Sequence, residues 1–294
     1  MRKAVPGLLL ALLAGCSRAP EEPAGTRLLA SDLVEVSGLA ASHAHPWLWA
    51  EQDSGNDPVL YAIGTDGSTL GTVRVQGATN TDWEDIALYE QGGQTWILLA
   101  DTGDNLSLRS EVRLYIVPEP DPHDATVPLQ QTIRVVYPNG PHDCEAVAVD
   151  PAGDTAWLVT KRDTPPQIFS VPLAPTDLPT VVAAAHGTVP HIPPPTAEDL
   201  QDSPRYGQYR SQPTALDLRP DVAVLQTYKD AYLFRRAEGQ DWGAALSGTP
   251  TVVDTPQLPQ TESATFTPDG HGLWITTEQA PAPLDLVPLP GAAP

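Results

Sequence analysis

The sequence predicts an all-β fold, a five-bladed β-propeller, and two observations support this prediction. Its 33 prolines and 22 glycines divide the chain into short runs rich in Val, Leu, Ile, Trp and Tyr, as in proteins built from many short strands joined by turns. A module of two apolar runs joined by a turn also recurs five times. Such a repeat is typical of propellers, in which a four-stranded blade takes about 40 to 50 residues.

Each module begins with a short apolar run that we expect to be the innermost strand of a blade. A turn rich in Pro, Asp and Gly follows, and then a second apolar run that ends in a polar residue. A β-sandwich does not explain a repeated module of this kind, and six blades are the alternative count. The five modules begin at Ser37, Glu84, Glu145, Thr214 and Glu262.

The two ends of the folded part are expected to share the last blade. After Glu262 the chain contains only three apolar runs, one fewer than a blade requires. We therefore expect residues 26–29 to supply the missing strand and to close the ring. The insertion in the longest interval between modules, roughly residues 186–213, is Pro-rich and polar and has no room for a further blade. The prediction is a single propeller domain over residues 26–294.

Residues 1–15 have the features of a secretory signal peptide. Arg2 and Lys3 form a positive segment, and the apolar run after them is shorter than the roughly 20 residues of a membrane span. Residues 13–16 (LAGC) resemble the lipobox of bacterial lipoproteins, which implies that Cys16 is acylated, with palmitate among the chains. Residues 16–25 are then a flexible tether.

The lipobox predicts an exported protein that is anchored in a bacterial membrane through Cys16. Ser17 follows Cys16, and no Asp is present there to indicate retention at an inner membrane. We therefore expect the outer membrane, with the protein facing the periplasm or the cell surface. The other cysteine, Cys144, has no disulfide partner if Cys16 is acylated, so we interpret it as a small buried apolar residue.

The charge balance excludes some partners. The chain has a formal net charge of −21, which repels nucleic acid and anionic lipid headgroups and attracts cations. We expect a monomer whose partners are the membrane, through the lipid, and a small molecule or peptide.

Repeated polar residues predict a site at one end of the propeller. The first strand of a blade lines the central channel and the second returns beside it, so the start of the first and the end of the second lie at the same end of the channel. Polar residues at these positions should form an acidic funnel. The candidate catalytic residues are Glu84, Glu145, Lys161, Tyr228 and Glu262.

Further carboxylates expected at this funnel are candidate metal ligands. Clustered carboxylates repel one another, so they need a cation, a shared proton or an ammonium group. Ca²⁺ fits a set of oxygen ligands, and no His/Cys pair has the spacing of a zinc site. Two similar loops, residues 53–57 and 101–105, follow second strands and supply several of the oxygens, although either loop alone also fits a simple Asx turn. The candidate ligands are Glu35, Asp53, Asp82, Asp101, Asp143 and Glu278.

Seven short motifs occur along the chain, in the order EVSGL (35–39), DSG (53–55), DWED (82–85), DTGDN (101–105), HDCEA (142–146), TK (160–161) and TY (227–228). In this order they resemble the motifs of a group of largely uncharacterised bacterial propeller proteins related to the SdiA-regulated and phytase/esterase-like propellers. The resemblance covers nearly the whole mature chain and implies a propeller, an extracytoplasmic setting and calcium. Gln226 stands where the pattern has Arg, and this departure argues against recognition of an anionic substrate group at that point.

Two functions fit these residues. In the first, the acidic funnel of a membrane-anchored lipoprotein binds a divalent cation and a small ligand or partner. In the second, the protein is a Ca²⁺-dependent hydrolase of a phosphoester, ester or lactone. Glu84, Glu145 and Glu262 would then be ligands or bases, and Lys161 and Tyr228 would stabilise negative charge. The sequence contains no Gly-x-Ser-x-Gly motif and no recognisable nucleophile, which favours binding.

Overall fold

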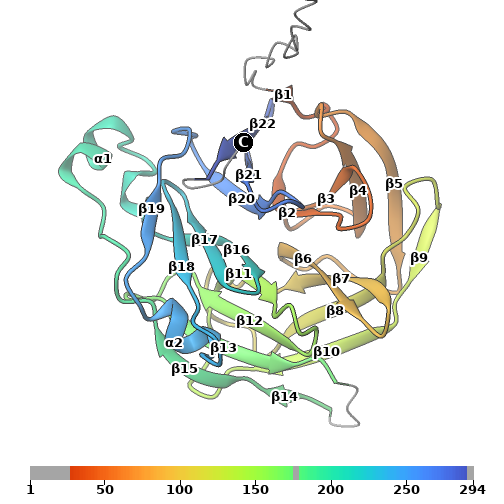
Figure 1. Cartoon of the computed structure of the whole chain (residues 1–294), viewed down its shortest axis with the longest axis horizontal. Coiled ribbons are helices and arrows are strands. Elements are labelled where there is room, and N and C mark those ends of the chain that lie inside the picture. Colours follow the sequence, from red (N-terminus) through yellow and green to blue (C-terminus); the bar gives the residue numbers. More distant parts are fainter. Residues whose placement is uncertain (1–26, 175–178, 290–294) are drawn as a thin grey trace, which may run out of the picture.

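The computed structural model describes residues 27–174 and 179–289, and these form five β-sheets arranged in a ring (Figure 1). Each sheet contains a blade of four antiparallel strands, which confirms the five-bladed propeller. In the first four blades these strands follow the sequence order from the axis outward, whereas in the fifth the outermost strand is the N-terminal β1 (Arg27–Leu28). The signal peptide, the lipobox with Cys16 and the tether lie outside the described residues. No helix in the described ranges is long and apolar enough to cross a membrane.

The strands follow the predicted modules. The innermost strands are β2 (Val36–Ala41), β6 (Trp83–Gln91), β11 (Cys144–Val149), β16 (Pro213–Arg219) and β20 (Thr261–Phe266). The second strands are β3 (Trp47–Gln52), β7 (Gln94–Asp101), β12 (Thr155–Thr160), β17 (Val222–Thr227) and β21 (Gly272–Thr277). The third strands are β4 (Val59–Gly64), β8 (Val112–Pro118), β13 (Gln167–Pro172), β18 (Ala231–Arg235) and β22 (Pro283–Pro288). The outer strands are β5 (Thr69–Gln76), β10 (Gln131–Val136), β15 (Ala184–Thr188), β19 (Thr251–Val253) and β1 (Arg27–Leu28).

The ring is closed by the N-terminal strand, as the sequence predicts. Strand β1 pairs antiparallel with β22, the third strand of the last blade, with Arg27 opposite Leu284. The amide of Leu29 donates to the carbonyl of Ala282 at 2.8 Å. Leu29 and Leu33 are buried in the same apolar cluster as Leu284, so packing between the first and last blades reinforces the closure.

Short segments cover the outer edges of three blades. Strand β9 (Thr126–Pro128) pairs parallel with β5, and β14 (Val181–Val182) pairs parallel with β10. Helix α2 (Trp242–Leu246) packs against β15. Each of these segments belongs to the connection between the third and fourth strands of the following blade. Covering the edge in this way satisfies or shields backbone groups that would otherwise template aggregation.

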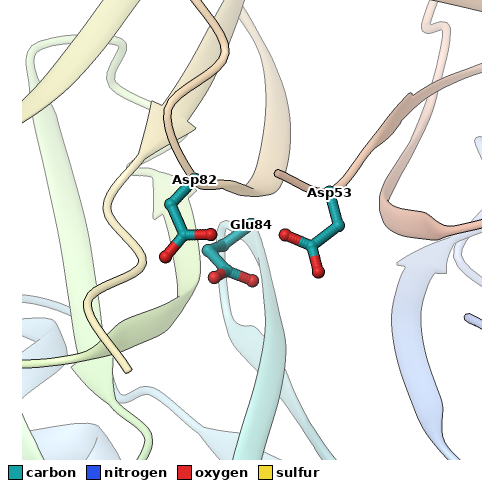
Figure 2. Close-up of side chains that lie close together, drawn as sticks. All are labelled: Asp53, Asp82 and Glu84. Atoms are coloured by element: carbon teal, nitrogen blue, oxygen red, sulfur yellow. The ribbon is translucent and has the colours of Figure 1, made fainter. Parts of the chain in front are cut away.

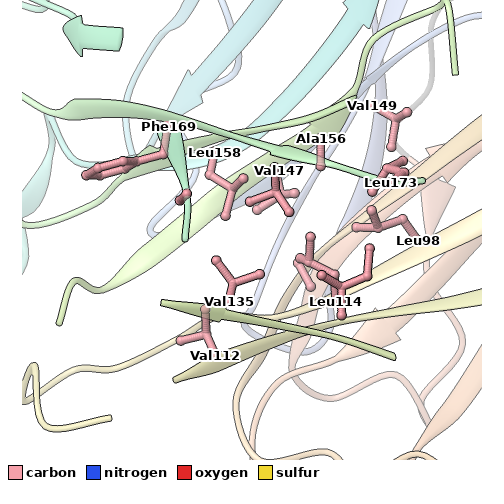
Figure 3. Packing of buried hydrophobic residues seen from close by; sticks show 14 of the residues in the cluster. Leu98, Val112, Leu114, Val135, Val147, Val149, Ala156, Leu158, Phe169 and Leu173 are labelled. Atoms are coloured by element: carbon pink, nitrogen blue, oxygen red, sulfur yellow. The ribbon is translucent and has the colours of Figure 1, made fainter. Parts of the chain in front are cut away.

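The apolar core is divided among the spaces between neighbouring blades. Figure 3 shows the cluster between the second and third blades, where Leu98 and Leu114 face Val147 and Leu158. Cys144 is fully buried in this cluster, as predicted, and its Sγ lies 3.3 Å from the carbonyl oxygen of Val159.

Side chains of the innermost strands also join the blades by hydrogen bonds. The Ser37 hydroxyl donates to the carbonyl of Glu84 at 2.9 Å, from the first blade to the second. The Thr214 hydroxyl donates to the carbonyl of Thr261 at 2.8 Å, from the fourth blade to the fifth. These buried bonds fix the position of the innermost strands around the axis.

The insertion of residues 186–213 contains no additional blade. After β15 it forms helix α1 (Ala197–Asp202) and the short 3₁₀ helix η1 (Gly207–Tyr209). Thr196 caps α1 in a capping box with Asp199, whose carboxylate also pairs with Lys229 at 2.7 Å. Arg210 donates to the carbonyls of Tyr228 and Leu258 at 3.2 and 3.1 Å, which holds the insertion on the ring.

Candidate functional site

Two sets of five equivalent positions surround one end of the axis. One set is the second residue of each innermost strand: Ser37, Glu84, Glu145, Thr214 and Glu262. The other is the first residue after each second strand: Asp53, Thr102, Lys161, Tyr228 and Glu278. Because the two strands are antiparallel neighbours, both sets face the same end of the channel.

A cavity of about 280 Å³ opens at this end, and its wall is mostly polar. All five predicted catalytic candidates line it, together with Asp53 and Glu278 from the predicted metal ligands. The complete lining is Ser37, Asp53, Glu84, Asn105, Glu145, Lys161, Arg162, Tyr206, Tyr209, Gln212, Tyr228, Gln260, Glu262 and Glu278.

Lys161 supplies a buried ammonium group to the cavity. Its Nζ forms an ion pair with Glu145 and lies 4.8 Å from the centre of the Tyr228 ring, in a cation–π contact. Burial by itself lowers the pKa of Lys161, but the carboxylates of Glu145 and Glu262 raise it, and the net pKa is well above the ordinary value. Lys161 therefore stays charged at neutral pH.

The three glutamates of the first set have raised pKa values. Burial raises the pKa of Glu145 to about 8, although Lys161 acts in the opposite direction. Burial, followed by the charge of Glu145, raises the pKa of Glu84 well above its ordinary value, and burial does the same for Glu262. The cavity therefore retains protons near neutral pH, and a cation that enters it has to displace them.

Asp53, Asp82 and Glu84 bring carboxylate oxygens within 4.8 Å of one another (Figure 2). Asp53 follows β3, Asp82 precedes β6, and Glu84 is the second residue of β6. Burial and the charge of Asp53 raise the pKa of Asp82 to about 6. Gly103 packs against this group so closely that a β-carbon there would collide with the carboxylates of Asp82 and Glu84.

The carboxylate oxygens of a second group, Glu84, Asp143 and Glu145, also lie within 4.8 Å of one another, but two of these residues are already paired with basic side chains. The Arg162 guanidinium lies 2.6 Å from the Asp143 carboxylate, and Lys161 pairs with Glu145. By contrast, no salt bridge within the described ranges involves Asp53, Asp82 or Glu84. The first group is therefore the better candidate for a cation from solution.

Asp101 does not lie where the sequence predicted. It is the last residue of β7, opposite Trp83, so Thr102 rather than Asp101 is equivalent to Asp53 and Lys161. A shift of one residue along a strand moves a side chain to the opposite face. Asp101 is fully buried away from the cavity and pairs with Arg109 at 2.8 Å.

Three other predicted ligands also lie outside the cavity wall. Glu35 accepts a hydrogen bond from the Asn56 side chain at 3.0 Å and does not line the cavity. Asp143 accepts from the Asp104 amide at 2.8 Å and is paired with Arg162. Asp82 is not part of the wall either, but it belongs to the carboxylate group beside it.

The insertion contributes to the cavity, which the sequence did not reveal. Tyr206, Tyr209 and Gln212 line the wall, although the insertion has the composition of a polar, Pro-rich connection. No repeat relates these residues to the blades, so no spacing argument could find them. Arg162 was missed for a similar reason, since it lies one residue beyond a repeated position, whereas Asn105 belongs to the predicted loop of residues 101–105.

His142 has a structural role. Its two ring nitrogens lie 2.9 Å from Asp163 and 3.0 Å from Asn139, and its ring packs against Tyr137 and Phe169. It does not line the cavity.

Comparisons with known proteins leave the activity open. No family model matches the sequence, and no curated protein matches it significantly. Among solved structures, a nidogen/laminin complex matches with a TM-score of 0.45 and 14% identity over 82% of this chain and 72% of that chain. U3-55K matches with a TM-score of 0.44 and 10% identity over 91% of this chain and 99% of that chain.

Proposed function

We propose that this protein is a binding propeller whose axial cavity takes a divalent cation, Ca²⁺ in the first instance, together with a small ligand. The observation that carries the proposal is the group of Asp53, Asp82 and Glu84, with carboxylate oxygens within 4.8 Å of one another and no basic side chain paired to them in the described residues. Hard cations prefer such oxygen ligands, and Ca²⁺ tolerates irregular geometry.

The raised pKa of Asp82 supports the same proposal. Burial, followed by repulsion from the Asp53 carboxylate, raises the pKa of Asp82, so this carboxyl group binds a proton more readily when no other cation is present. A divalent cation removes the repulsion without protonation. Other residues of the cavity wall, among them Tyr206, Tyr209 and Gln212, do not belong to this carboxylate group, and they can contact a second, organic ligand in the same cavity.

A Ca²⁺-dependent hydrolase of a phosphoester, ester or lactone is the second candidate. It is favoured by Glu145, whose pKa of about 8 suits proton transfer near neutral pH, in contact with the Lys161 ammonium on the same cavity wall. In this alternative Lys161 and Tyr228 stabilise negative charge on the substrate, and Glu145 or Glu262 moves the proton.

We further propose that the propeller is exported and anchored to a bacterial membrane by acylation, including palmitate, of Cys16. This rests on the sequence of residues 1–16 alone. Mass spectrometry of the mature protein tests it, because acylation adds the mass of the lipid to a chain that begins at Cys16. An unmodified chain that still contains residues 1–15 would contradict it.

Calorimetric titration with Ca²⁺ tests the cation site. A form that begins at Ser17 keeps every described strand of the ring and avoids lipid. We expect saturable binding close to one equivalent, lost in an Asp82→Asn/Glu84→Gln double variant. Asp57→Asn is the control, since Asp57 is exposed and pairs only with Arg74. Binding that persists in the double variant, or no binding in the unaltered chain, rejects the proposed site.

A further inference from the structure

A loop at the mouth of the cavity displays two leucines to solvent. Leu106 and Leu108 are 77% and 75% exposed, the highest values among large apolar side chains in the described ranges. We call residues 105–109 the leucine loop. Its first residue, Asn105, lines the cavity and accepts a hydrogen bond from Arg162. Leu106 and Leu108 therefore follow a residue of the cavity wall by one and three positions along the chain.

The leucine loop is fixed in this exposed position. The carboxylate of Asp104 accepts hydrogen bonds from the amides of Leu108 and Arg109 at 2.8 and 2.7 Å. The amide of Asp104 is itself bonded to Asp143 at 2.8 Å, and Arg109 pairs with Asp101. Leu106 and Leu108 cannot turn into the core without breaking these bonds, so their apolar surface is available to a molecule from outside.

The cavity beside the loop suits a positively charged head group. Glu262 and Glu278 line it, and neither forms a salt bridge within the described part of the chain. Burial raises the pKa of both carboxyl groups, so a cationic head group takes the place of protons that they retain. The protein itself provides a precedent, because the Lys161 ammonium is held in the same cavity by Glu145 and the Tyr228 ring. At about 280 Å³ the polar cavity accommodates a head group and little more.

We propose that the small ligand of this cavity is an amphiphile with an ammonium head and an alkyl chain. The head lies among Glu262, Glu278 and Tyr228, and the chain leaves the cavity across Leu106 and Leu108. This proposal rests on the proposed binding function and names the class of its ligand. An anionic membrane surface is a poorer fit to the loop, because the acidic mouth beside it repels anionic headgroups.

Calorimetry with butyl-, hexyl-, octyl- and decylammonium, at constant Ca²⁺ and below micelle formation, tests the proposal on the form that begins at Ser17. Affinity should rise with chain length, by at most about fourfold for each methylene that the leucines cover. In a Leu106→Ser/Leu108→Ser variant the rise should disappear, while butylammonium binding is retained. Val252→Ser is the control, since Val252 is 55% exposed on β19.

Each result decides the matter. Equal chain-length dependence in the variant and the unaltered chain rejects contact with the leucines. No binding of any alkylammonium, with Ca²⁺ binding intact in the same samples, rejects this ligand class alone, whereas loss of both rejects the proposed function as well. Binding of the unaltered chain to zwitterionic lipid vesicles that the leucine variant lacks, without chain-length dependence, would identify the loop as a membrane contact and overturn the proposal.

Discussion

The Asp85 carboxylate of the second blade accepts a hydrogen bond from the Leu216 amide of the fourth blade, with 3.1 Å between Oδ2 and N. The same oxygen accepts from the Val147 amide of the third blade at 2.8 Å. One side chain thus joins three innermost strands just below the cavity. Glu84 is adjacent to Asp85 in sequence, and Glu145 lies two residues before Val147. The positions of both glutamates therefore depend on this junction.

Replacing Asp85 should therefore destabilise the whole ring. In Asp85→Ala the buried amides of Val147 and Leu216 lose their acceptor, and we expect a loss of about 3 kcal/mol or more in the free energy of unfolding. Asp85→Asn keeps an acceptor oxygen and should lose about 1 kcal/mol or less. Denaturant unfolding of both variants measures the difference. Equal losses would show that the junction does not depend on these bonds.

Lys161 and Glu145 should be coupled in stability. Both side chains are buried, so Lys161→Met leaves the Glu145 carboxylate without its cation and should cost about 3 to 5 kcal/mol near pH 8. In the Lys161→Met/Glu145→Gln double variant most of this loss should be recovered, because no unpaired charge remains. A double-mutant cycle by denaturant unfolding gives the coupling. Strict additivity of the two single changes would contradict the pairing.

The metal-free protein should become more stable on mild acidification. Burial raises the pKa of Glu51 and of Glu145 to about 8 in the folded state, whereas both ionise near their ordinary value of 4.5 when unfolded. Between these values the folded state binds more protons, so stability falls as pH rises from about 4.5 to about 8. The slope is at most about 1.4 kcal/mol per pH unit for each group.

Glu51→Gln separates the contribution of Glu51 from the rest. Glu51 is fully buried, and among residues 27–174 and 179–289 neither of its carboxylate oxygens has a hydrogen-bond partner. The variant should therefore be more stable than the unaltered chain at pH 8.5 and similar to it at pH 5. Thermal unfolding followed at both pH values in the presence of a chelator provides the measurement. A variant that is less stable at pH 8.5 would show that the charged form is favoured in the folded protein.

Gly103→Ala should weaken cation binding more than it weakens the fold. A β-carbon at residue 103 collides with the carboxylates of Asp82 and Glu84, which have to move apart. We expect Ca²⁺ affinity to fall at least about tenfold, since precise ligand placement determines affinity in such sites. Gly248→Ala is the control, because Gly248 has no positive φ and the added carbon meets only the carbonyl oxygen of Ala245, at 3.1 Å. Equal effects of the two changes on Ca²⁺ binding would contradict this account.

The ring could be predicted from the sequence because each blade contributes the same local pattern of apolar runs separated by turns. The blade count and the closing strand follow from counting apolar runs, and Arg27 does pair with Leu284. The cavity was predictable to the same extent, since Glu84, Glu145 and Glu262 occupy equivalent positions.

What the sequence could not provide is the exact register and the contribution of the insertion. Asp101 and Thr102 are neighbours, and only the hydrogen-bonded register decides which of them occupies the position equivalent to Asp53 and Lys161. Tyr206 and Tyr209 belong to an insertion without periodicity, so their position depends on long-range contacts such as that of Arg210 with Leu258. Contacts of this kind leave no local pattern.

The closing strand has a consequence for the order in which the protein is assembled. Strand β1 is synthesised first, yet its partner β22 is synthesised last, more than 250 residues later. The last blade cannot be completed until almost the whole chain has been made, and, for an exported protein, until it has crossed the membrane. The finished cavity, which takes residues from every blade, should therefore be a late product of biogenesis.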